Sequence, residues 1–435
     1  MKVDSLPANW ASFKLSEIAA GAGQSVAPKN YPQETFDLFS VPAFENRVPD
    51  QPLGEEIKSN KQSVEPGNVL LCKIVPHLNR VWTVPEKATN RQIASGEWVR
   101  YDTAGLDPEY VRLALSSPEF RDEFMTTISG VGGSLTRARP QMFNQFDIPL
   151  PPLAEQKRIV EKLDQLSARI RAAKDHLTHV QTLATRAKQA TLAAAFDSGF
   201  DTLELGELAQ EIRYGTSKKC GYDLGSTPVL RIPNVAGGKI NSADLKSADF
   251  DSKEIDKLSL MAGDLLLIRS NGSIDLVGRS ALVGEEHTGY LYAGYLIRVR
   301  LDHERARPEY VQQVLASVAS REFIERLAKS TSGVNNINSA QIASIPVPLP
   351  PLEEQTEIVR RIETAFARID RMVAEATKAL ALLERLEAQL LAKAFRGELV
   401  PQDPNDEPAS ALLARIRDAR ANAPKPKRAR QSAKA

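Results

Sequence analysis

The segment Pro151-Pro152-Leu153-Ala154-Glu155-Gln156 decides the fold, because the chain repeats it as Pro350-Pro351-Leu352-Glu353-Glu354-Gln355. The two copies stay in register without a gap as far as Ala195-Phe196 and Ala394-Phe395. An internal repeat of this length indicates a duplicated architecture, in which each copy belongs to one structural unit. The function is therefore sought first in each half of the chain and only then in single residues.

A heptad pattern of apolar residues follows each proline pair. The apolar positions alternate steps of four and three residues, and Lys, Arg, Glu, Asp, Gln and Thr occupy most of the positions between them. This pattern predicts two helices, each with one coiled-coil seam and one solvated face. The seam residues of the first copy are Ile159, Leu163, Leu166, Ile170, Ala173, Leu177, Val180, Ala184 and Ala187. Those of the second copy are Ile358, Ile362, Ala365, Ile369, Met372, Ala376, Ala379, Leu383, Leu386 and Leu390.

The ends of both helices carry start and stop signals. Each proline pair suits a first helical turn, Glu155 and Glu354 lie where the helix dipole favours a carboxylate, and Gly199 and Gly397 can close the far ends. Each helix is expected to be roughly 40 residues long, or about 60 Å. An apolar seam of this length must be buried, and the nearest available partner is the other copy. The alternative is two unrelated coiled coils that pair with other proteins.

The sequence thus predicts an α+β protein with two similar α/β-type domains, which we call head 1 and head 2. Two long helices separate the heads and form an intramolecular antiparallel coiled coil. The predicted boundaries are 1–150 for head 1, 151–198 for the first helix, 199–348 for head 2, 349–400 for the second helix and 401–435 for a C-terminal segment with a basic tail, expected to be disordered.

The two heads share short landmarks, although the loops between them differ. Each head is expected to have a strand leading into a helix start, a turn feeding a buried strand, and a helix that opens with Pro-Glu-Tyr-Val and ends near Ile128 or Ala328. The matching segments are Phe13–Ala19 with Leu203–Ala209, Pro66–Leu71 with Ala262–Leu267, and Pro108–Val111 with Pro308–Val311. A common scaffold with different loops is the pattern expected of one fold with two specificities.

The composition argues against several classes of protein. The chain of 435 residues carries 56 Lys and Arg against 55 Asp and Glu, a net charge of +1, so it is not a general polycation. Its apolar stretches are interrupted by charges, which excludes a signal peptide or membrane span and favours a cytoplasmic protein. Cys72 and Cys220 are not in a paired spacing, so neither a disulfide framework nor a zinc site is expected.

Polar loops near the buried strands and before the long helices contain the candidate binding residues. Arg269-Ser270-Asn271-Gly272-Ser273 follows the predicted buried strand of head 2 and precedes Leu276-Val277-Gly278-Arg279. Arg and Asn are the side chains that read guanine and adenine edges with two hydrogen bonds. The acid-free stretches Gly130–Arg139 and Lys329–Asn338 suit phosphate and base contacts. A polar hairpin turn, or a flexible surface loop, explains each stretch about as well on its own.

No catalytic motif is present in the sequence. It lacks a phosphate-binding glycine-lysine loop, a dinucleotide glycine fingerprint and an Asn-Pro-Pro-Tyr motif of the amino-methylating type. A catalytic function is therefore not expected, and no metal-binding or cofactor-binding residue is assigned.

The whole pattern resembles the specificity subunit of type I restriction-modification systems over roughly residues 1–415. The resemblance rests on two heads, two Pro-Pro-Leu-x-Glu-Gln helices, and the closing segments Ala394–Asp403 and Asp406–Ala409. It implies that each head is a target-recognition domain reading one half of a bipartite site on double-stranded DNA. It also implies that the coiled coil spaces the heads and docks two modification (methyltransferase) subunits, with restriction (translocase/endonuclease) subunits completing the complex. S-adenosylmethionine, ATP and Mg²⁺ are then expected on these partners only.

Within this resemblance, Gly263–Ser273 is similar to a common segment of the family's recognition domains. Head 1 departs from it with Cys72-Lys73-Ile74-Val75-Pro76-His77 at the comparable place. The alternative is a coiled-coil adaptor whose heads bind proteins rather than DNA. The candidate DNA-binding residues are Arg137, Arg139, Lys218, Lys219, Arg269, Asn271, Ser273, Arg279, Asn335 and Asn336.

Overall fold

The computed structural model describes residues 6–20, 25–86, 90–129, 136–197, 199–331 and 333–422. Two compact units form: residues 1–175 with 379–435, and residues 176–378. Head 1 belongs to the first unit and head 2 to the second. Each unit therefore contains one head and one part of each long helix, so the two copies of the sequence repeat correspond to two structural units.

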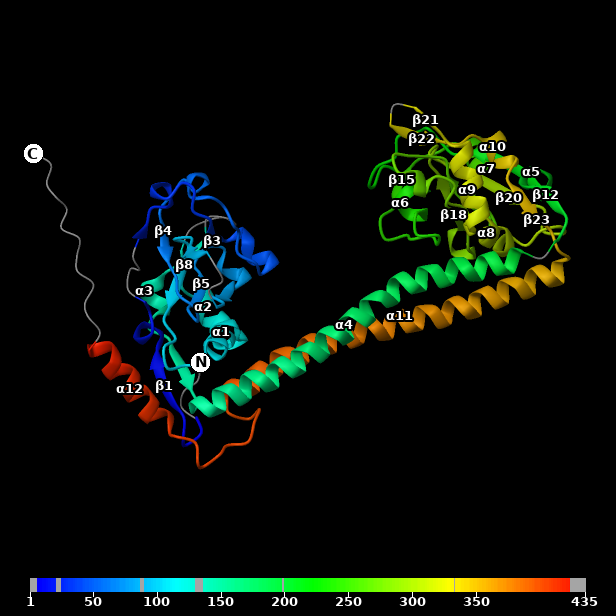
Figure 1. Cartoon of the computed structure of the whole chain (residues 1–435). Helices are drawn as coiled ribbons and strands as arrows, with labels where there is room; N and C mark the ends of the chain where they lie inside the picture. The colour runs from blue at the N-terminus through cyan, green and yellow to red at the C-terminus, as the bar shows by residue number, and fades with distance from the viewer. Residues whose placement is uncertain are drawn as a thin grey trace, which may run out of the picture. The chain divides into compact units, whose positions relative to one another are not determined.

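The two long helices are α4 (Leu153–Phe196) and α11 (Leu352–Phe395), each of 44 residues. Ion pairs across them show their direction. Lys174 Nζ lies 2.7 Å from Glu387 Oε2 in the first unit, and Lys188 Nζ lies 2.5 Å from Asp370 Oδ1 in the second. From Lys174 to Lys188 the residue numbers on α4 increase, while those of their partners on α11 decrease from 387 to 370. The two helices are therefore antiparallel, as predicted (Figure 1). The α+β fold class is confirmed as well.

Most of the predicted seam residues lie on the covered side of the helices. Ile159, Leu163 and Ile170 of α4 and Ile358 and Ile362 of α11 are buried. Among the other seam residues Ala376 is buried and Ala187 is exposed. The half-buried ones are Leu166, Ala173, Leu177, Val180, Ala184, Ala365, Ile369, Ala379, Leu383 and Leu390.

Met372 and Leu386 lie outside this stripe, with 63% and 42% of their surface exposed. The covered positions of α11 next to the shared seam are instead Phe366, Val373 and Leu380, which are half-buried. Positions three and four residues beyond a shared seam position both recur every seven residues. The apolar pattern of α11 fits either choice, with Phe366, Val373 and Leu380 in one and Ala365, Met372 and Ala379 in the other.

Replacement of a seam residue tests this phase directly. Ile362 is only 1% exposed. We expect Ile362→Ala to lower the free energy of unfolding by about 2–4 kcal/mol, because it leaves a cavity at a buried site. Met372→Ala should change it by less than about 0.5 kcal/mol, since exposed positions away from special contacts contribute little. Denaturant unfolding of both variants measures the difference, and equal losses would contradict the observed seam.

Head 1 is built on two small sheets. A three-stranded antiparallel sheet has the order β6-β5-β8, and a four-stranded sheet has the order β2-β4-β7-β3, in which β3 and β7 run parallel. The first pair of strands, β1 and β11, joins the two ends of the head. The bounds are β1 Ala11–Lys14, β2 Ser25–Val26, β3 Phe36–Phe39, β4 Lys61–Ser63, β5 Val69–Cys72, β6 Val81–Thr83, β7 Arg91–Ala94, β8 Trp98–Tyr101, β9 Ile128–Ser129, β10 Arg137–Ala138, β11 Asp147–Leu150 and α3 Pro140–Phe143.

Head 2 repeats this plan, with two longer strands, β13 and β20, of 6 residues each. Its main sheet has the antiparallel order β13-β20-β16-β18, and a second sheet has the order β15-β14-β19, with β14 and β19 parallel. Strands β12 and β23 join the ends as β1 and β11 do in head 1. The bounds are β12 Thr202–Glu204, α5 Leu205–Leu208, β13 Ala209–Tyr214, β14 Thr227–Leu230, α6 Ile232–Val235, β15 Lys246–Ala248, α7 Ser252–Leu258, β16 Leu265–Ile268, β17 Ser270–Asn271, β18 Ser280–Leu282, β19 Leu291–Tyr292, β20 Leu296–Leu301, β21 Lys329–Thr331, β22 Val334–Asn336, α10 Ser339–Ala343 and β23 Pro346–Pro348.

The helix expected after each Pro-Glu-Tyr-Val segment is interrupted, which corrects the prediction. Head 1 has α1 (Pro108–Ser116) and α2 (Pro118–Met125), and head 2 has α8 (Pro308–Ala316) and α9 (Val318–Leu327). The breaks lie at Ser117 and Ser317, which both have an extended backbone. The hydroxyl of each serine accepts a hydrogen bond from the backbone N–H three residues later, that of Phe120 or Ser320. Each serine thus caps the start of a new helix. In head 1, Pro118 also disfavours a helical conformation of Ser117, which contributes to the break.

A hydrogen-bonded joint fixes head 1 to the start of α4. Gln156 is fully buried, its Oε1 accepts the N–H of Asp107 at 2.9 Å, and its Nε2 donates to the carbonyl of Pro151 at 2.9 Å. The hydroxyl of Tyr110 donates to the carbonyl of Pro149 at 2.9 Å. The glutamine of the repeated motif thus ties the first turn of α4 to the start of α1.

The same joint recurs in head 2. Gln355 is fully buried, its Oε1 accepts the N–H of Arg307 at 2.8 Å, and its Nε2 donates to the carbonyls of Pro350 at 2.9 Å and Arg305 at 3.1 Å. The hydroxyl of Tyr310 donates to the carbonyl of Pro348 at 2.8 Å. Each head is therefore held to its own helix by the same glutamine, and the same tyrosine fixes the strand that leads into that helix.

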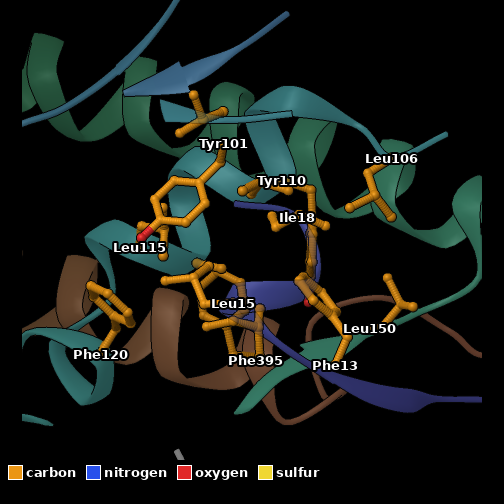
Figure 2. Packing of buried hydrophobic residues seen from close by; sticks show 14 of the residues in the cluster. Phe13, Leu15, Ile18, Tyr101, Leu106, Tyr110, Leu115, Phe120, Leu150 and Phe395 are labelled. Carbon is orange, nitrogen blue, oxygen red and sulfur yellow. The ribbon is translucent and has the colours of Figure 1, made fainter. Parts of the chain in front are cut away.

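The C-terminal segment completes the core of head 1. Phe395 at the end of α11 packs against Tyr110, with ring centroids 5.6 Å apart, among the side chains drawn in Figure 2. Gly397 follows with φ +74°, a left-handed turn in which a Cβ would meet Pro7 at 2.4 Å. This glycine closes α11 as the sequence predicted.

Helix α12 (Ala409–Asn422) then lies against head 1, with Leu412, Leu413 and Ile416 buried. Arg417 Nε donates to Glu17 Oε2 at 2.6 Å, and this bond holds the pKa of Glu17 below its ordinary value. Arg158 of α4 pairs with Asp406 at 2.6 Å. The basic tail at 423–435 lies outside the described residues. No helix of the described residues is both long and apolar enough to cross a membrane.

Candidate nucleic-acid interface

In head 2 the two polar loops singled out in the sequence form one small sheet. Strand β17 pairs with β22, with Ser270 opposite Asn336 and Asn271 opposite Asn335. Strand β22 also pairs with β21. The loop that follows the buried strand β16 and the loop that precedes α10 are thus joined edge to edge. Four of the candidate residues, Arg269, Asn271, Asn335 and Asn336, are brought together here.

Arg269 is held in place from two sides. Its Nε and Nη2 both donate to Asn336 Oδ1 at 3.3 Å, and its guanidinium lies 4.8 Å from the centre of the Tyr214 ring. The Tyr214 hydroxyl in turn accepts the N–H of Ser339 at 2.9 Å. A guanidinium fixed by an amide and an aromatic face is pre-organised, because less side-chain freedom is lost when it binds a ligand.

The other side chains of this sheet are engaged in shaping it. Asn335 Nδ2 donates to the carbonyl of Gly272 at 3.0 Å, and Asn271 Oδ1 accepts the N–H of Ser273 at 2.8 Å. Arg279 lies elsewhere: its Nε donates to the carbonyl of Asp275 at 2.8 Å and its Nη1 to that of Ala236 at 3.4 Å. It lines a groove of about 1220 Å³ between head 2 and the parts of α4 and α11 in the same unit.

Head 1 brings its corresponding loops together in the same way. Ala138 donates its N–H to the carbonyl of Lys73 at 2.8 Å, Val75 donates to Thr136 at 3.1 Å, and Ile74 forms a bridge with Arg137. The loop after the buried strand β5 therefore meets the strand before α3, just as the loop after β16 meets the strand before α10. The stretch Gly130–Leu135 of this predicted loop lies outside the described residues.

The two candidate cations of head 1 differ in their surroundings. Arg137 is exposed, but its Nη2 pairs with Glu97 Oε1 at 3.0 Å. Arg139 is exposed at the start of α3. Val75 has φ +48°, which is rare for a β-branched residue and marks local strain in the loop after β5. The two heads thus share a loop arrangement but differ in the side chains it presents.

Lys218 and Lys219 lie beside a second hollow of head 2, of about 500 Å³. Sequence reasoning found these two lysines but missed Arg231, Lys246, Tyr295 and the Tyr214 that supports Arg269. Tyr214 ends the strand β13, and Tyr295 is 64% exposed in the turn before β20. Exposed tyrosines at strand ends were a usable signal, whereas the meeting of Lys246 with Lys218 depends on the tertiary fold.

Within the described residues no group of His, Cys, Asp and Glu side chains has the arrangement of a metal site. Cys72 is buried and Cys220 half-buried, and burial raises the pKa of both thiols. A raised pKa leaves a thiol protonated and weakly nucleophilic.

The chain is similar to proteins of one family. A family model described as the type I restriction modification DNA specificity domain matches residues 114–181 and 197–378. The type I restriction enzyme EcoKI specificity subunit of Escherichia coli (strain K12) is 36% identical over 313 residues, covering 67% of each chain. The StySPI specificity subunit of Salmonella potsdam is 31% identical over 339 residues, covering 73% of this chain and 72% of that one.

Solved structures share the fold. The crystal structure of the HsdS subunit from Thermoanaerobacter tengcongensis matches with a TM-score of 0.64 and 22% identity, covering 91% of this chain and 98% of that one. A chain from a study of complex assembly and conformational transition of the type I R-M system matches with a TM-score of 0.74 and 22% identity, covering 91% and 99%. The chain therefore belongs to the family of type I restriction-modification specificity subunits, the non-catalytic and cofactor-free components that give such complexes their DNA target and act together with partner subunits.

Proposed function

We propose that each head reads one half of a bipartite target on double-stranded DNA, and that the coiled coil sets the gap between the halves. The observation that carries the proposal is the repeated joining of two loops: in each head, the loop after the buried central strand pairs with the strand before the short helix. Two equivalent surfaces with different side chains suit two different half-sites. In head 2, Arg269 and Asn336 are of the types that bind base edges.

We further propose that the long helices dock two modification subunits, with restriction subunits completing the complex. Large apolar side chains remain exposed on these helices: Leu183 at 58% and Met372 at 63% in one unit, and Leu382 at 62% and Leu386 at 42% in the other. Apolar residues that a chain leaves uncovered in this way are suited to a partner surface. S-adenosylmethionine, ATP and Mg²⁺ would then be bound by the partners, in the cytoplasm.

Methylation mapping in cells that carry the whole system tests the proposed reading of DNA. The expected result is one asymmetric motif with two specific parts and a fixed non-specific gap. Modification at a single continuous motif would contradict the division of work between two heads.

A coiled-coil adaptor with protein-binding heads is the competing function, and a mobility-shift assay separates the two. The chain is co-expressed with its modification subunit and mixed with DNA that carries the mapped motif or a scrambled version of it. A recognition subunit is expected to shift the first DNA more strongly, whereas an adaptor would give no sequence-specific shift.

The proposed reader of head 2 can be tested with one substitution. Arg269→Ala is expected to lose about 1–3 kcal/mol of discrimination at one base pair, because a bidentate contact to a base edge is removed. Base-resolution methylation data should show that one position of one half-site becomes degenerate while the other half-site is unchanged.

Arg279→Ala is the matched control, because this arginine binds the carbonyls of Asp275 and Ala236 outside the β17-β22-β21 sheet. Its motif should stay intact. If Arg269→Ala leaves the motif intact as well, Arg269 does not read a base.

A further inference from the structure

The second hollow of head 2 has a basic wall. Three lysines and one arginine reach it from the β13–β14 loop, the end of β14 and strand β15. The lining residues are Ser217, Lys218, Lys219, Cys220, Val229, Arg231, Ile232, Pro233, Lys246, Ala293 and Tyr295, none of them acidic. Its volume of about 500 Å³ leaves room for a small anionic group.

Two of the four cations are balanced by carboxylates at the rim. Lys218 Nζ lies 3.5 Å from Glu254 Oε2, and Arg231 Nη2 lies 3.0 Å from Asp244 Oδ2. In the part of the chain that the structure describes, Lys219 and Lys246 have no carboxylate within 4.0 Å. Lys246 lies 5.3 Å from the centre of the exposed Tyr222 ring. The hollow therefore keeps a surplus of about two positive charges, which favours an anion.

The hollow shares a wall with the sheet that holds Arg269. The N–H of Arg269 donates to the carbonyl of Tyr295 at 3.0 Å, and Tyr295 also lines the hollow. The N–H of Gly294 donates to the carbonyl of Thr216 at 2.7 Å, which ties the same turn to the loop that carries Lys218 and Lys219. A group bound in the hollow would therefore lie beside whatever Arg269 contacts.

We propose that this hollow binds a backbone phosphate of the DNA next to the half-site that head 2 reads, with Lys219 and Lys246 as the main contacts. The inference rests on the proposed function and adds a division of labour within head 2. Phosphate contacts fix the register of a protein on DNA but carry no sequence information, whereas base-edge contacts carry it. Head 2 then positions itself through the hollow and discriminates through the β17-β22-β21 sheet.

The test is the salt dependence of DNA binding by the assembled specificity and modification complex. The variant Lys219→Ala with Lys246→Ala is compared with the unaltered protein on DNA carrying the mapped target and on DNA with a scrambled head 2 half-site. We expect the slope of log affinity against log salt to become shallower by about 0.9, as for one lost phosphate contact. Affinity for both DNAs should fall by the same factor, so that their ratio stays within about twofold of the ratio for the unaltered complex.

Three further arms keep the result interpretable. Lys219→Arg with Lys246→Arg keeps the charge and should keep the slope. Lys253→Ala with Lys257→Ala removes two exposed lysines from α7, outside the hollow lining, and should also keep the slope. Arg269→Ala should lower the ratio between the two DNAs and leave the slope nearly unchanged.

An unchanged slope for the Lys219 and Lys246 alanine variant, or a lower ratio between the DNAs, would overturn the phosphate site. Both results leave the proposed function standing as long as the unaltered complex prefers its target. The proposed function itself would fail if the unaltered complex showed no such preference. Thermal unfolding of each variant identifies any loss that is due to misfolding.

Discussion

Insertion of one heptad into both long helices is expected to lengthen the gap of the DNA target by about 3 bp. Seven helical residues add about 10.5 Å, and each base pair occupies about 3.4 Å of the duplex. The pairing of Lys174 with Glu387 and of Lys188 with Asp370 shows which parts of the helices face each other. Suitable insertion points therefore lie after Lys174 and before Glu387, which pair within one unit, and a heptad keeps the phase of the seam.

Methylation mapping of the inserted protein measures the new gap. The sequences of the two half-sites should not change, because the heads are untouched. Insertion into α4 alone is the control: it leaves seven residues without partners on α11 and should abolish modification rather than shift the gap. A gap of unchanged length in the double insertion would contradict the idea that the helices set the spacing.

The helices could be predicted from the sequence because their determinants are local and repeated. Proline pairs, a first-turn glutamate and a heptad pattern all lie within one stretch, and each occurs twice. The exposure of Met372 could not be predicted, because the apolar residues of α11 fit two seam choices. Which choice is covered depends on the side chains that α4 offers opposite it.

The break at Ser117 was within reach of sequence reasoning, since Ser-Pro is a known helix-start signal. The break at Ser317 has no proline and was harder to see. The candidate nucleic-acid interface could be predicted only in part from the sequence. Loop composition identified Arg269 and Asn336, but their bond through the pairing of β17 with β22 joins segments more than sixty residues apart. Tyr214 supports Arg269 from a third segment; its exposed position at a strand end was a usable signal, but its contact with Arg269 depends on the tertiary fold.

The second large effect is expected at the joint between head 2 and α11. Gln355→Ala should lower the free energy of unfolding by about 3 kcal/mol, because it leaves the N–H of Arg307 and the carbonyl of Arg305 without their partner. It should also loosen the angle between the head and its helix. Methylation mapping is then expected to show modified sites whose gap differs by about 1 bp from that of the unaltered protein. A head that turns at this joint is displaced along the duplex, and one base pair corresponds to a displacement of about 3.4 Å.

Two further variants separate a loss of stability from a loss of alignment. Gln389→Ala removes an exposed glutamine of the same helix and should change neither quantity. Gln355→Met keeps most of the side-chain volume but not the hydrogen bonds, so it should broaden the gap as Gln355→Ala does while costing less stability. If both Gln355 variants are less stable but still modify sites of a single gap length, the glutamine only stabilises head 2. If the gap broadens in both, the repeated motif fixes the direction in which each head meets the duplex, and a glutamine is required there because its amide both donates to and accepts from backbone groups.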